Sequence, residues 1–350
     1  YNGDYAILRS LLKVKVLIVT YNSIGQHFGG LQVQIFNTKK ELENLGHFVK
    51  LFDPWNDKIM DYDIIHFFSF LDTSTVSLMQ EAKRCGKLIV MSTVYNDILN
   101  VHKQKTQLLL SKVHPTLSIE KYRQQLMIEY IDLFVFLSSK EEKLFEEVFK
   151  LKGKKSIVIK NGVENLYLQQ NYNLSNHSTE KYKVRDYVLH VGQFTKNKNQ
   201  LVLIKALADT NIPLIMIGDI IEEKYYQECC KCLTSNMKIL PAVKYGDTML
   251  LELYKGAKLF ALPSFKEAYP LTVLEAGLQG TKVLLTENSL FDDENIDVTY
   301  CNPHDERSIR EWIINYSGKS SACNILNKDV YSWKYQISLL DKEYKNLMKR

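Results

Sequence analysis

Short apolar segments alternate with amphipathic segments along most of the chain. The first half holds six short runs rich in Val, Ile and Leu, at residues 13–21, 47–53, 63–70, 87–94, 133–139 and 156–163. Such runs, with little polar alternation, are typical of strands buried on both faces of a parallel sheet. Between the first two runs, Leu31, Ile35 and Leu42 recur at helical spacing, and Gly46 follows as a stop signal. The pattern therefore predicts repeated strand–helix units.

The same series begins again after a polar stretch at 169–186, which has no periodic apolar face and predicts a loop. Further strands are expected at 187–194, 213–219, 237–243, 258–264 and 281–287. Helices are expected after Asn199 and at about 222–233, 246–256 and 270–279. We predict an α/β fold with two Rossmann-like domains, residues 1–165 and 166–330, whose parallel sheets face each other across a cleft. Residues 331–350 are expected to form a helix that packs back on the first domain.

Composition narrows the class of protein. The 45 basic and 40 acidic residues give a net charge of +5, and only 7 of the basic residues are Arg, which argues against a dedicated nucleic-acid-binding protein. No apolar run approaches the roughly 18 residues of a membrane span, and no signal peptide is evident, so we expect a cytoplasmic protein. Cys229, Cys230 and Cys232 lie in a helix-like segment without a fourth metal ligand, and we interpret them as free thiols.

The segment 263–280 carries the clearest chemistry. Pro270 suits the first turn of a helix, which leaves Glu267 in the preceding loop and puts Glu275 about 7.5 Å along the helix axis. The free N–H groups near Leu271 and Thr272 would suit an anion such as a diphosphate. Carboxylates on either side of a bound phosphate match a ligand built of sugar, diphosphate and ribose.

Two other loops open helices in ways that suit an anionic ligand. In 190–207 a strand ends at Gly192, and Lys196 and Lys198 precede a helix whose dipole they oppose, which makes sense if an anion neutralises them. In 22–32 the pair Gly29–Gly30 allows a ligand to approach the backbone at a further helix start. Alone, each of these loops is a weak signal.

Together, these segments resemble the retaining glycosyltransferases of family 4, which have the GT-B fold. The resemblance runs nearly end to end, through NLGHFVKLFD, YDIIHFF, FVFLSSKEEKLF, IKNGVE, VGQFTKNKN, LIMIGD, LYKGAKLFALPS, KEAYPLTVLEAGLQG, CNPHDE and YSW. It implies that Glu267 faces the donor sugar, Glu275 the nucleotide ribose and Lys198 the diphosphate, with Glu267 and Lys198 as the catalytic pair. The donor-binding residues expected from it are Gln193, Lys198, Val243, Ala268, Tyr269, Pro270, Leu271, Thr272 and Glu275.

The chain departs from the family pattern at three places. Gln193 stands where the family usually has an Arg beside the diphosphate, and Pro241 replaces a frequent Gly near the base-binding loop. The strand end 92–96 lacks the His that contacts substrate in many members, and Thr93 or Tyr95 is expected to take its position. With Gly29, Gly30 and His27, these two residues make up the predicted acceptor side of the cleft.

Weaker signals have structural alternatives. Asp61 and Asp63 are spaced like a metal-binding D-x-D pair, but they open a strand without a metal frame, so no metal site is predicted. His66 alternates within that strand and is interpreted as a core or cleft-lining residue. The stretch 98–127 is both apolar and basic, with Lys103, Lys105, Lys112, Lys121 and Arg123. It is either a solvated helix face or a contact with an anionic membrane.

We therefore expect a retaining hexosyltransferase that moves a sugar from a nucleoside diphosphate to an acceptor hydroxyl, without a metal or other cofactor. UDP is favoured over GDP, and the acceptor would be a glycan, a lipid-linked molecule or a protein in surface glycan assembly, at the inner face of the plasma membrane. Two alternatives remain at this point. One is a GT-B epimerase of nucleotide sugars, which would need no acceptor, and the other is a catalytically silent partner subunit.

Overall fold

The computed structural model describes residues 13–26, 29–151, 153–169, 186–316, 325 and 327–349. The chain divides into two compact units, each with one parallel sheet. Unit 1 comprises residues 1–162 and 333–350, and unit 2 comprises residues 163–332. Unit 2 is thus an insertion between the two parts of unit 1, and α14 (Trp333–Leu347) belongs to unit 1.

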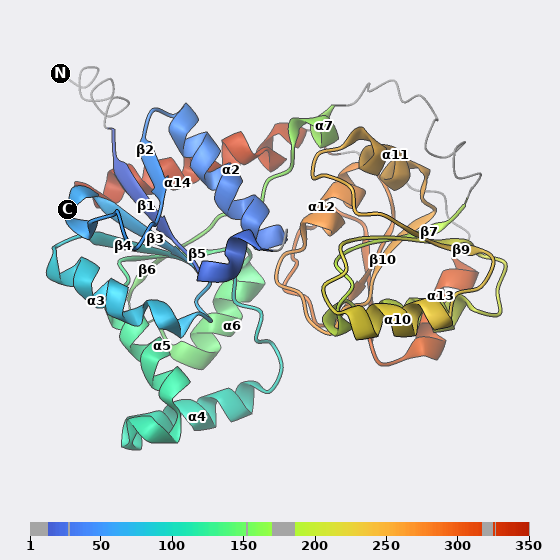
Figure 1. Cartoon of the computed structure of the whole chain (residues 1–350), viewed down its shortest axis with the longest axis horizontal. Coiled ribbons are helices and arrows are strands. Elements are labelled where there is room, and N and C mark those ends of the chain that lie inside the picture. Colours follow the sequence, from blue (N-terminus) through green and yellow to red (C-terminus); the bar gives the residue numbers. More distant parts are fainter. Residues whose placement is uncertain are drawn as a thin grey trace. The chain divides into compact units, whose positions relative to one another are not determined.

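The sheet of unit 1 has six parallel strands in the order β2-β1-β3-β4-β5-β6 (Figure 1). The strands are β1 (Lys15–Val19), β2 (Phe48–Leu51), β3 (Ile64–Phe68), β4 (Leu88–Ser92), β5 (Leu133–Phe136) and β6 (Lys155–Val158). Each strand lies within a predicted apolar run or overlaps it. Because helices cover both faces, the strands need apolar residues at successive positions, and this explains why the runs do not alternate.

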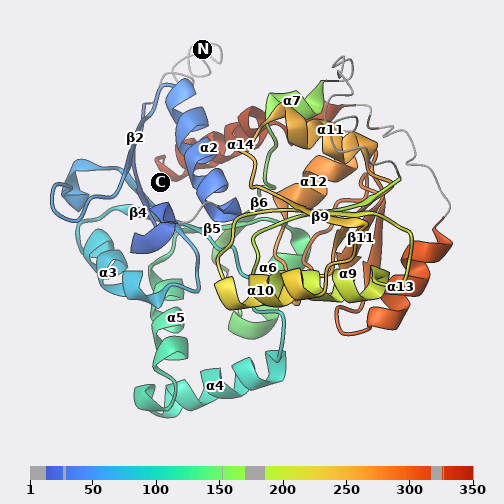
Figure 2. The same ribbon diagram turned by 45° about the vertical axis from the view of Figure 1, so that its right-hand side comes forward.

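Successive residues of one strand enter two different cores. Leu17 and Val19 of β1 join one core, while Val16 and Ile18 join the other. The α-helices of the unit, besides α14, are α2 (Gly30–Asn44), α3 (Val76–Arg84), α4 (Val101–Val113), α5 (Ile119–Tyr130) and α6 (Ser139–Phe149). Short 3₁₀ turns are η1 (Asn22–Gly25), η2 (Ile59–Asp61), η3 (Thr73–Thr75) and η4 (Pro115–Leu117). In both ribbon views α2 and α14 lie above the sheet, and α3, α5 and α6 lie below it (Figures 1 and 2).

Helix α14 completes the upper core of unit 1. Its buried face packs beside α2 and contributes Ile337, Leu340 and Tyr344. Two buried histidines also hold it. The backbone N–H of Val14 donates to Nδ1 of His47, so Nε2 carries the proton and donates to Asp341 at 2.8 Å. The Tyr344 hydroxyl lies 2.6 Å from Nδ1 of His66.

The sheet of unit 2 is also parallel, in the order β12-β11-β10-β7-β8-β9. Its strands are β7 (Val188–Val191), β8 (Leu214–Ile217), β9 (Met237–Leu240), β10 (Leu259–Leu262), β11 (Val283–Thr286) and β12 (Val298–Cys301). The first five were predicted. The edge strand β12 was missed because its sequence, VTYC, is short and only Cys301 is buried, which leaves no apolar run to detect.

Helices cover both faces of this sheet as well. They are α7 (Asn165–Leu168), α9 (Gln200–Leu207), α10 (Glu223–Lys231), α11 (Thr248–Gly256), α12 (Leu271–Leu278) and α13 (Glu306–Asn315), with 3₁₀ turns η5 (Lys196–Lys198) and η6 (Lys328–Tyr331). One core joins α9, α10 and α13 to Val188, Met216 and Ala261 of the sheet. The predicted loop at 169–186 falls largely outside the described residues. Among the helices that the structure describes, none is long and apolar enough to cross a membrane.

Candidate functional site

The strand order of unit 2 reverses direction beside β7. From β7 the chain adds β8 and β9 on one side, then returns to place β10, β11 and β12 on the other. In open α/β sheets such a reversal leaves a crevice at the carboxyl ends of the two central strands, where ligands bind. The loops after β7 and β10 carry Lys198 and Glu267, so the topology places both predicted catalytic residues at this point.

Backbone hydrogen bonds hold these two loops together. The N–H of Phe265 donates to the carbonyl of Asn197 at 2.8 Å, and the Asn197 side chain donates to the carbonyl of Lys266 at 3.1 Å. Asn199, with φ of 55°, turns the chain into α9, and its side chain donates to the carbonyls of Pro263 and Pro303. Because Asn adopts the left-handed conformation more readily than most residues, it suits this turn. The sequence indicated Asn199 only as the start of a helix. The hydrogen bonds from its side chain to the carbonyls of other loops were missed.

Lys198 and Glu267 form an ion pair. The ammonium Nζ lies 2.5 Å from Oε1 of Glu267, and both side chains are largely buried. The backbone N–H of Glu267 donates to the carbonyl of Asn288, which fixes the carboxylate at the base of its loop. The two residues were predicted separately, and the structure brings them into contact. The pairing compensates the charges of two side chains that are largely removed from water.

Glu275 lies inside the unit rather than at its surface. Helix α12 begins after Pro270, no side chain caps its first turn, and Glu275 is only 2% exposed. The Tyr254 hydroxyl donates to its carboxylate at 2.9 Å, and Glu164 and Tyr167 lie close enough to interact electrostatically. Burial raises the pKa of Glu275 to about 8. The hydroxyl of Tyr167 is buried without a hydrogen-bond partner in the structure.

The other predicted donor-binding residues lie around these two carboxylates or on neighbouring loops. Ala268 and Tyr269 precede α12, and the Tyr269 ring packs on Phe291 at 4.7 Å. Leu271 and Thr272 open the uncapped first turn, as predicted. Gln193 lies two residues after the end of β7, where its carbonyl accepts from the side chain of Gln200. Val243 lies in the loop between β9 and α11.

Sequence inspection missed several polar groups at the same strand ends. Three side chains there are fully buried and have an atom without a hydrogen-bond partner: Nε2 of His190, Oε1 of Gln200 and Oγ of Ser264. Tyr254 and Tyr167, beside Glu275, were also missed. A histidine two residues before the Gly192 turn was a usable signal, whereas Gln200, Tyr254 and Tyr167 look like ordinary helix residues in the sequence.

In unit 1 the corresponding reversal lies between β1 and β3. Gly29 is the N-cap of α2 and Gly30 its first residue, as the Gly–Gly pair suggested, while His27 lies outside the described residues. Nearby, Oγ1 of Thr20 and Oε1 of Gln32 are buried without hydrogen-bond partners among the residues that the structure describes. These two residues were not predicted.

Thr93 and Tyr95 do not reach the surface, so the structure does not support their predicted acceptor position. Both are fully buried. The Thr93 hydroxyl and the Tyr95 backbone N–H donate to Oε1 of Glu141, each at 2.6 Å, and the Leu137 N–H donates to Oε2. The Tyr95 ring packs among aromatic rings that include Phe145. Glu141 therefore ties β4 and β5 to the start of α6 from the inside.

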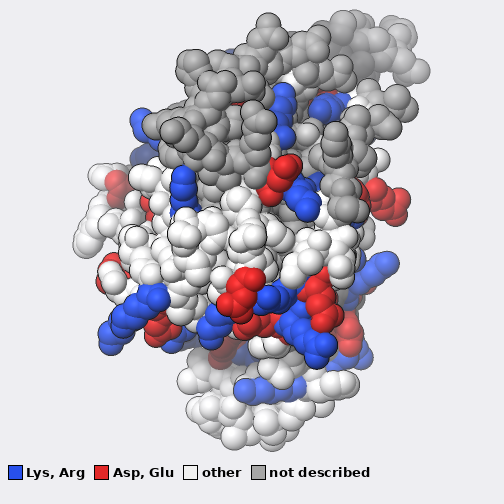
Figure 3. All heavy atoms as spheres, turned by 90° about the vertical axis from the view of Figure 1, so that its right-hand side faces the viewer, with Lys and Arg blue, Asp and Glu red and all other residues white. Residues whose placement is uncertain are grey.

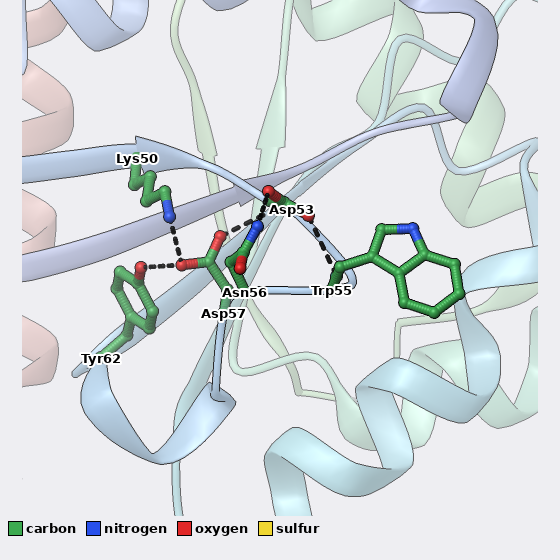
Figure 4. Close-up of polar contacts among 6 residues, drawn as sticks. All are labelled: Lys50, Asp53, Trp55, Asn56, Asp57 and Tyr62. Carbon is green, nitrogen blue, oxygen red and sulfur yellow. Dashed lines mark hydrogen bonds and ion pairs between the residues drawn. The ribbon is translucent and has the colours of Figure 1, made fainter.

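Asp61 and Asp63 have structural contacts. Asp63 accepts from the backbone N–H of Lys15 at 2.8 Å, and Tyr62, between them, donates to Asp57 at 2.6 Å (Figure 4). Asp57 also accepts from Lys50, which fixes the loop after β2. His66 is fully buried between Ser92 and Tyr344 and is a core residue, and burial lowers its pKa to about 3.

Cys229 and Cys230 lie in α10 and Cys232 directly follows it; all three are free thiols. No group of three His, Cys, Asp or Glu residues is arranged for a metal among the described residues.

The basic stretch around α4 and α5 is corrected in part. Lys121 is only 3% exposed, its ammonium lies over the Phe149 ring, and it cannot serve a surface. Lys105 pairs with Glu147 at 2.7 Å. Lys103, Lys112 and Arg123 are exposed, beside a set of exposed apolar residues that we call the α4–α5 ridge. The ridge consists of Leu109, Leu110, Val113, Leu117 and Ile119. Where α4 lies, the lowest part of Figure 3 carries mostly uncharged side chains.

Comparison with known protein families finds a match in the part of the chain that carries the candidate site. Residues 173–312, which include Lys198, Glu267 and Glu275, match the family model for glycosyl transferases group 1. No curated protein matches the chain at a significant level of sequence similarity.

Solved structures share the fold along nearly the whole chain. Sucrose-phosphate synthase from Thermosynechococcus elongatus superposes with a TM-score of 0.72 at 15% identity, over 96% of this chain and 100% of that one. Anabaena HepE, solved with UDP and glucose, gives 0.68 at 16% identity, over 96% and 99% of the two chains. WaaG, a glycosyltransferase of lipopolysaccharide biosynthesis, gives 0.59 at 14% identity, over 95% of each chain. The predicted GT-B fold is thus confirmed, and the group 1 resemblance is confirmed for residues 173–312.

Proposed function

We propose that this protein transfers a sugar from a nucleoside diphosphate sugar to an acceptor hydroxyl. The observation that carries the proposal is the Lys198–Glu267 pair at the strand reversal of unit 2, beside the uncapped first turn of α12. The match of this segment to glycosyl transferases group 1 supports it. HepE, which shares the fold, has been solved with UDP and with UDP-glucose, and this favours UDP over GDP as the nucleotide.

Each part of the site suits one part of the donor. Lys198 and the N–H groups of Leu271 and Thr272 are suited to the diphosphate, whose negative charge grows as the sugar leaves. Glu267 would accept hydrogen bonds from the sugar hydroxyls, and Glu275 from the ribose. Gln193, which is neutral, adds no second cation, so Lys198 carries most of the electrostatic stabilisation.

We propose retention of configuration, with the acceptor attacking from the face that the diphosphate leaves. Retaining glycosidases place two carboxyl groups about 5 Å apart and use one as nucleophile. Here Glu267 and Glu275 are assigned to opposite ends of the donor, and neither is a nucleophile in this scheme. The anomeric configuration of the product, measured by NMR, tests this assignment.

A metal is not needed in this proposal, because Lys198 and helix N–H groups take the place of a divalent cation at the leaving group. Turnover in EDTA should equal turnover in buffer. Loss of activity that Mn²⁺ or Mg²⁺ restores would contradict this part of the proposal.

The acceptor is proposed to be a glycan, a lipid-linked molecule or a protein in surface glycan assembly, handled at an anionic membrane. The α4–α5 ridge supports this location, since its exposed leucines and Val113 lie beside Lys103, Lys112 and Arg123. Apolar side chains with basic neighbours are the combination that binds an anionic lipid surface.

The deciding experiment combines binding and turnover. Thermal stabilisation by UDP, GDP and their sugars identifies the nucleotide, because a ligand that binds only the folded state raises its stability. Incubation of that donor with acceptors then separates transfer from epimerisation, which releases sugar without an acceptor. Lys198→Met should lose binding of the diphosphate, while Lys205→Met, at an exposed position of α9, is the matched control. Wild-type protein that neither binds nor turns over any nucleotide sugar would overturn the proposed function.

A further inference from the structure

His190 is buried beneath the Lys198–Glu267 pair and has one nitrogen that nothing in the structure uses. It lies on β7, is fully buried, and its Nδ1 is 2.9 Å from the carbonyl oxygen of Ala261 on the neighbouring strand β10. A carbonyl only accepts, so the proton is on Nδ1 and Nε2 presents a bare lone pair. Burial lowers the pKa of His190 to about 4, which keeps the ring neutral at physiological pH.

Nε2 has no hydrogen-bond partner in the structure. A buried acceptor without a partner is energetically unfavourable, so such atoms call for a reason. The space around it is defined by Gly192. A Cβ atom built at Gly192 would lie 3.3 Å from Nε2 of His190, 3.5 Å from Cδ of Lys198 and 3.7 Å from Cε of Lys198. The side chain of Lys198 therefore passes close to the unused lone pair.

Lys198 must change partners if the proposed function is correct. In the structure its ammonium bonds Glu267, yet the proposed mechanism needs that carboxylate for the sugar and the ammonium for the diphosphate. A lysine released from its partner regains rotamer freedom, which weakens its hold on a ligand. A neutral acceptor is suited to restrain it, because it orients the ammonium without cancelling its positive charge.

We propose that Nε2 of His190 is the second hydrogen-bond acceptor for Lys198 and orients its ammonium toward the diphosphate when the donor binds. The ammonium has three N–H donors, enough for a phosphate oxygen and Nε2 together. His190 is thus a positioning residue that acts through Lys198. This inference rests on the proposed function and adds to it a residue that the donor-binding set does not contain.

The test uses two variants that each keep one nitrogen position of the ring. His190→Asn keeps a donor near the Nδ1 position for Ala261 but lacks the distal acceptor, whereas His190→Gln places a polar group near the Nε2 position. Calorimetric binding of UDP and of uridine reports the diphosphate separately from the nucleoside. We expect His190→Asn to weaken UDP binding about tenfold, or 1.4 kcal/mol, with uridine binding unchanged, and His190→Gln to restore most of the loss.

A double-mutant cycle with Lys198→Met shows whether His190 acts through Lys198. In the Lys198→Met background, His190→Asn should have no further effect on UDP affinity, because the group it orients is absent. Urea unfolding of each variant checks that the fold is retained, and His190→Gln keeps the test valid if the Asn variant is unstable.

The possible failures are distinct. Equal loss of UDP and uridine affinity, additive effects in the cycle, or a Gln variant no better than Asn would overturn the role of His190 and leave the proposed function standing. If the wild-type protein binds neither UDP nor GDP, the proposed function fails and this inference fails with it.

Discussion

β4 and β10 are both inner strands of their sheets, and the polar groups that follow them are used in opposite ways. After β4, Thr93 and Tyr95 are fully buried and share a carboxylate, Glu141, with a third donor from β5. After β10, Glu267 has a single cationic partner, and buried polar atoms nearby have none. The first arrangement is saturated and stabilises the fold. The second keeps hydrogen-bonding capacity for a ligand.

The largest effect is expected at Glu267, and it tests whether the polar groups after β10 serve a ligand. Glu267→Gln should lower turnover a hundredfold or more while largely sparing UDP binding, since a contact made in the transition state is lost. Glu275→Ala should instead weaken UDP binding, because it is proposed to contact the ribose. Steady-state kinetics and calorimetry measure the two effects, with the exposed Glu228→Gln as control. Equal loss of nucleotide affinity in both variants would contradict the division of roles.

At the saturated end, the expected loss is stability rather than activity alone. Glu141→Ala leaves two backbone N–H groups without their carboxylate acceptor and the Thr93 hydroxyl with only its 3.3 Å contact to the carbonyl of Val135, and should lower the free energy of unfolding by roughly 2 kcal/mol or more. Urea denaturation measures the change. Glu146→Ala, on the exposed face of the same helix, should change stability by about 0.5 kcal/mol or less. Glu141→Ala with unaltered stability would show that this strand end is not held as described.

The raised pKa of Glu275 predicts that the free energy of unfolding depends on pH. Its folded pKa of about 8 lies above the ordinary value of 4.5, so folding favours its protonated form. This contribution to stability is fully present below pH 4.5 and is lost as the pH rises to about 8. The slope should be near 1.4 kcal/mol per pH unit within that window. Glu275→Gln should flatten this part of the profile, measured by denaturation at a series of pH values. If Glu275→Gln leaves the pH dependence of stability unchanged, the pKa of Glu275 is not raised as described and its carboxylate lies in a more polar environment.

The affinity for uridine should depend on the same ionisation of Glu275. If the ribose hydroxyls donate to ionised Glu275, uridine binding must release the proton that the free protein holds. Uridine affinity should then rise by up to tenfold per pH unit and level off above about pH 8. Tyr254, Tyr167 and Glu164 face this carboxylate, so Glu275→Gln, which leaves them in place, is the control that should remove the pH dependence.

The smallest effect is expected at the α4–α5 ridge, which is part of neither strand end. Replacing Leu109, Leu110 and Val113 with Ser should weaken binding to phosphatidylglycerol vesicles about tenfold, because apolar area is lost from the contact. Co-sedimentation at low and high salt measures it, and neutral phosphatidylcholine vesicles are the comparison. Lys121→Ser should leave vesicle binding unchanged if the protein stays folded, because Lys121 is buried. Vesicle binding that is the same for the wild-type protein and the ridge variants would contradict the proposed location at a membrane.

The sequence predicted the strands and helices whose apolar residues recur in a regular pattern. Both sheets followed from runs buried on two faces, whereas β12 escaped because three of its four residues are not buried. In the site, Lys198 and Glu267 were found as separate loop residues, and their ion pair depends on a contact across 69 positions that no local pattern reports. Lys121 and Thr93 were misplaced for the same reason. Their burial is decided by Phe149 and Glu141, which reach them from α6.

The insertion of unit 2 into unit 1 has a consequence for synthesis on the ribosome. The chain leaves unit 1 at residue 162 and returns at 333, where Val163 donates to the carbonyl of Tyr331 at 2.8 Å. Unit 2 is one continuous segment, so all of its strands and helices can assemble as soon as that segment has emerged. The upper core of unit 1 contains Ile337, Leu340 and Tyr344, which are made after the whole of unit 2. The N-terminal unit must therefore finish second, against the usual order in which domains fold from the N-terminus. Until then the part of its upper apolar face that α14 covers stays exposed, and nascent chains stopped before residue 333 should be bound by chaperones or cleaved by proteases in unit 1, not in unit 2.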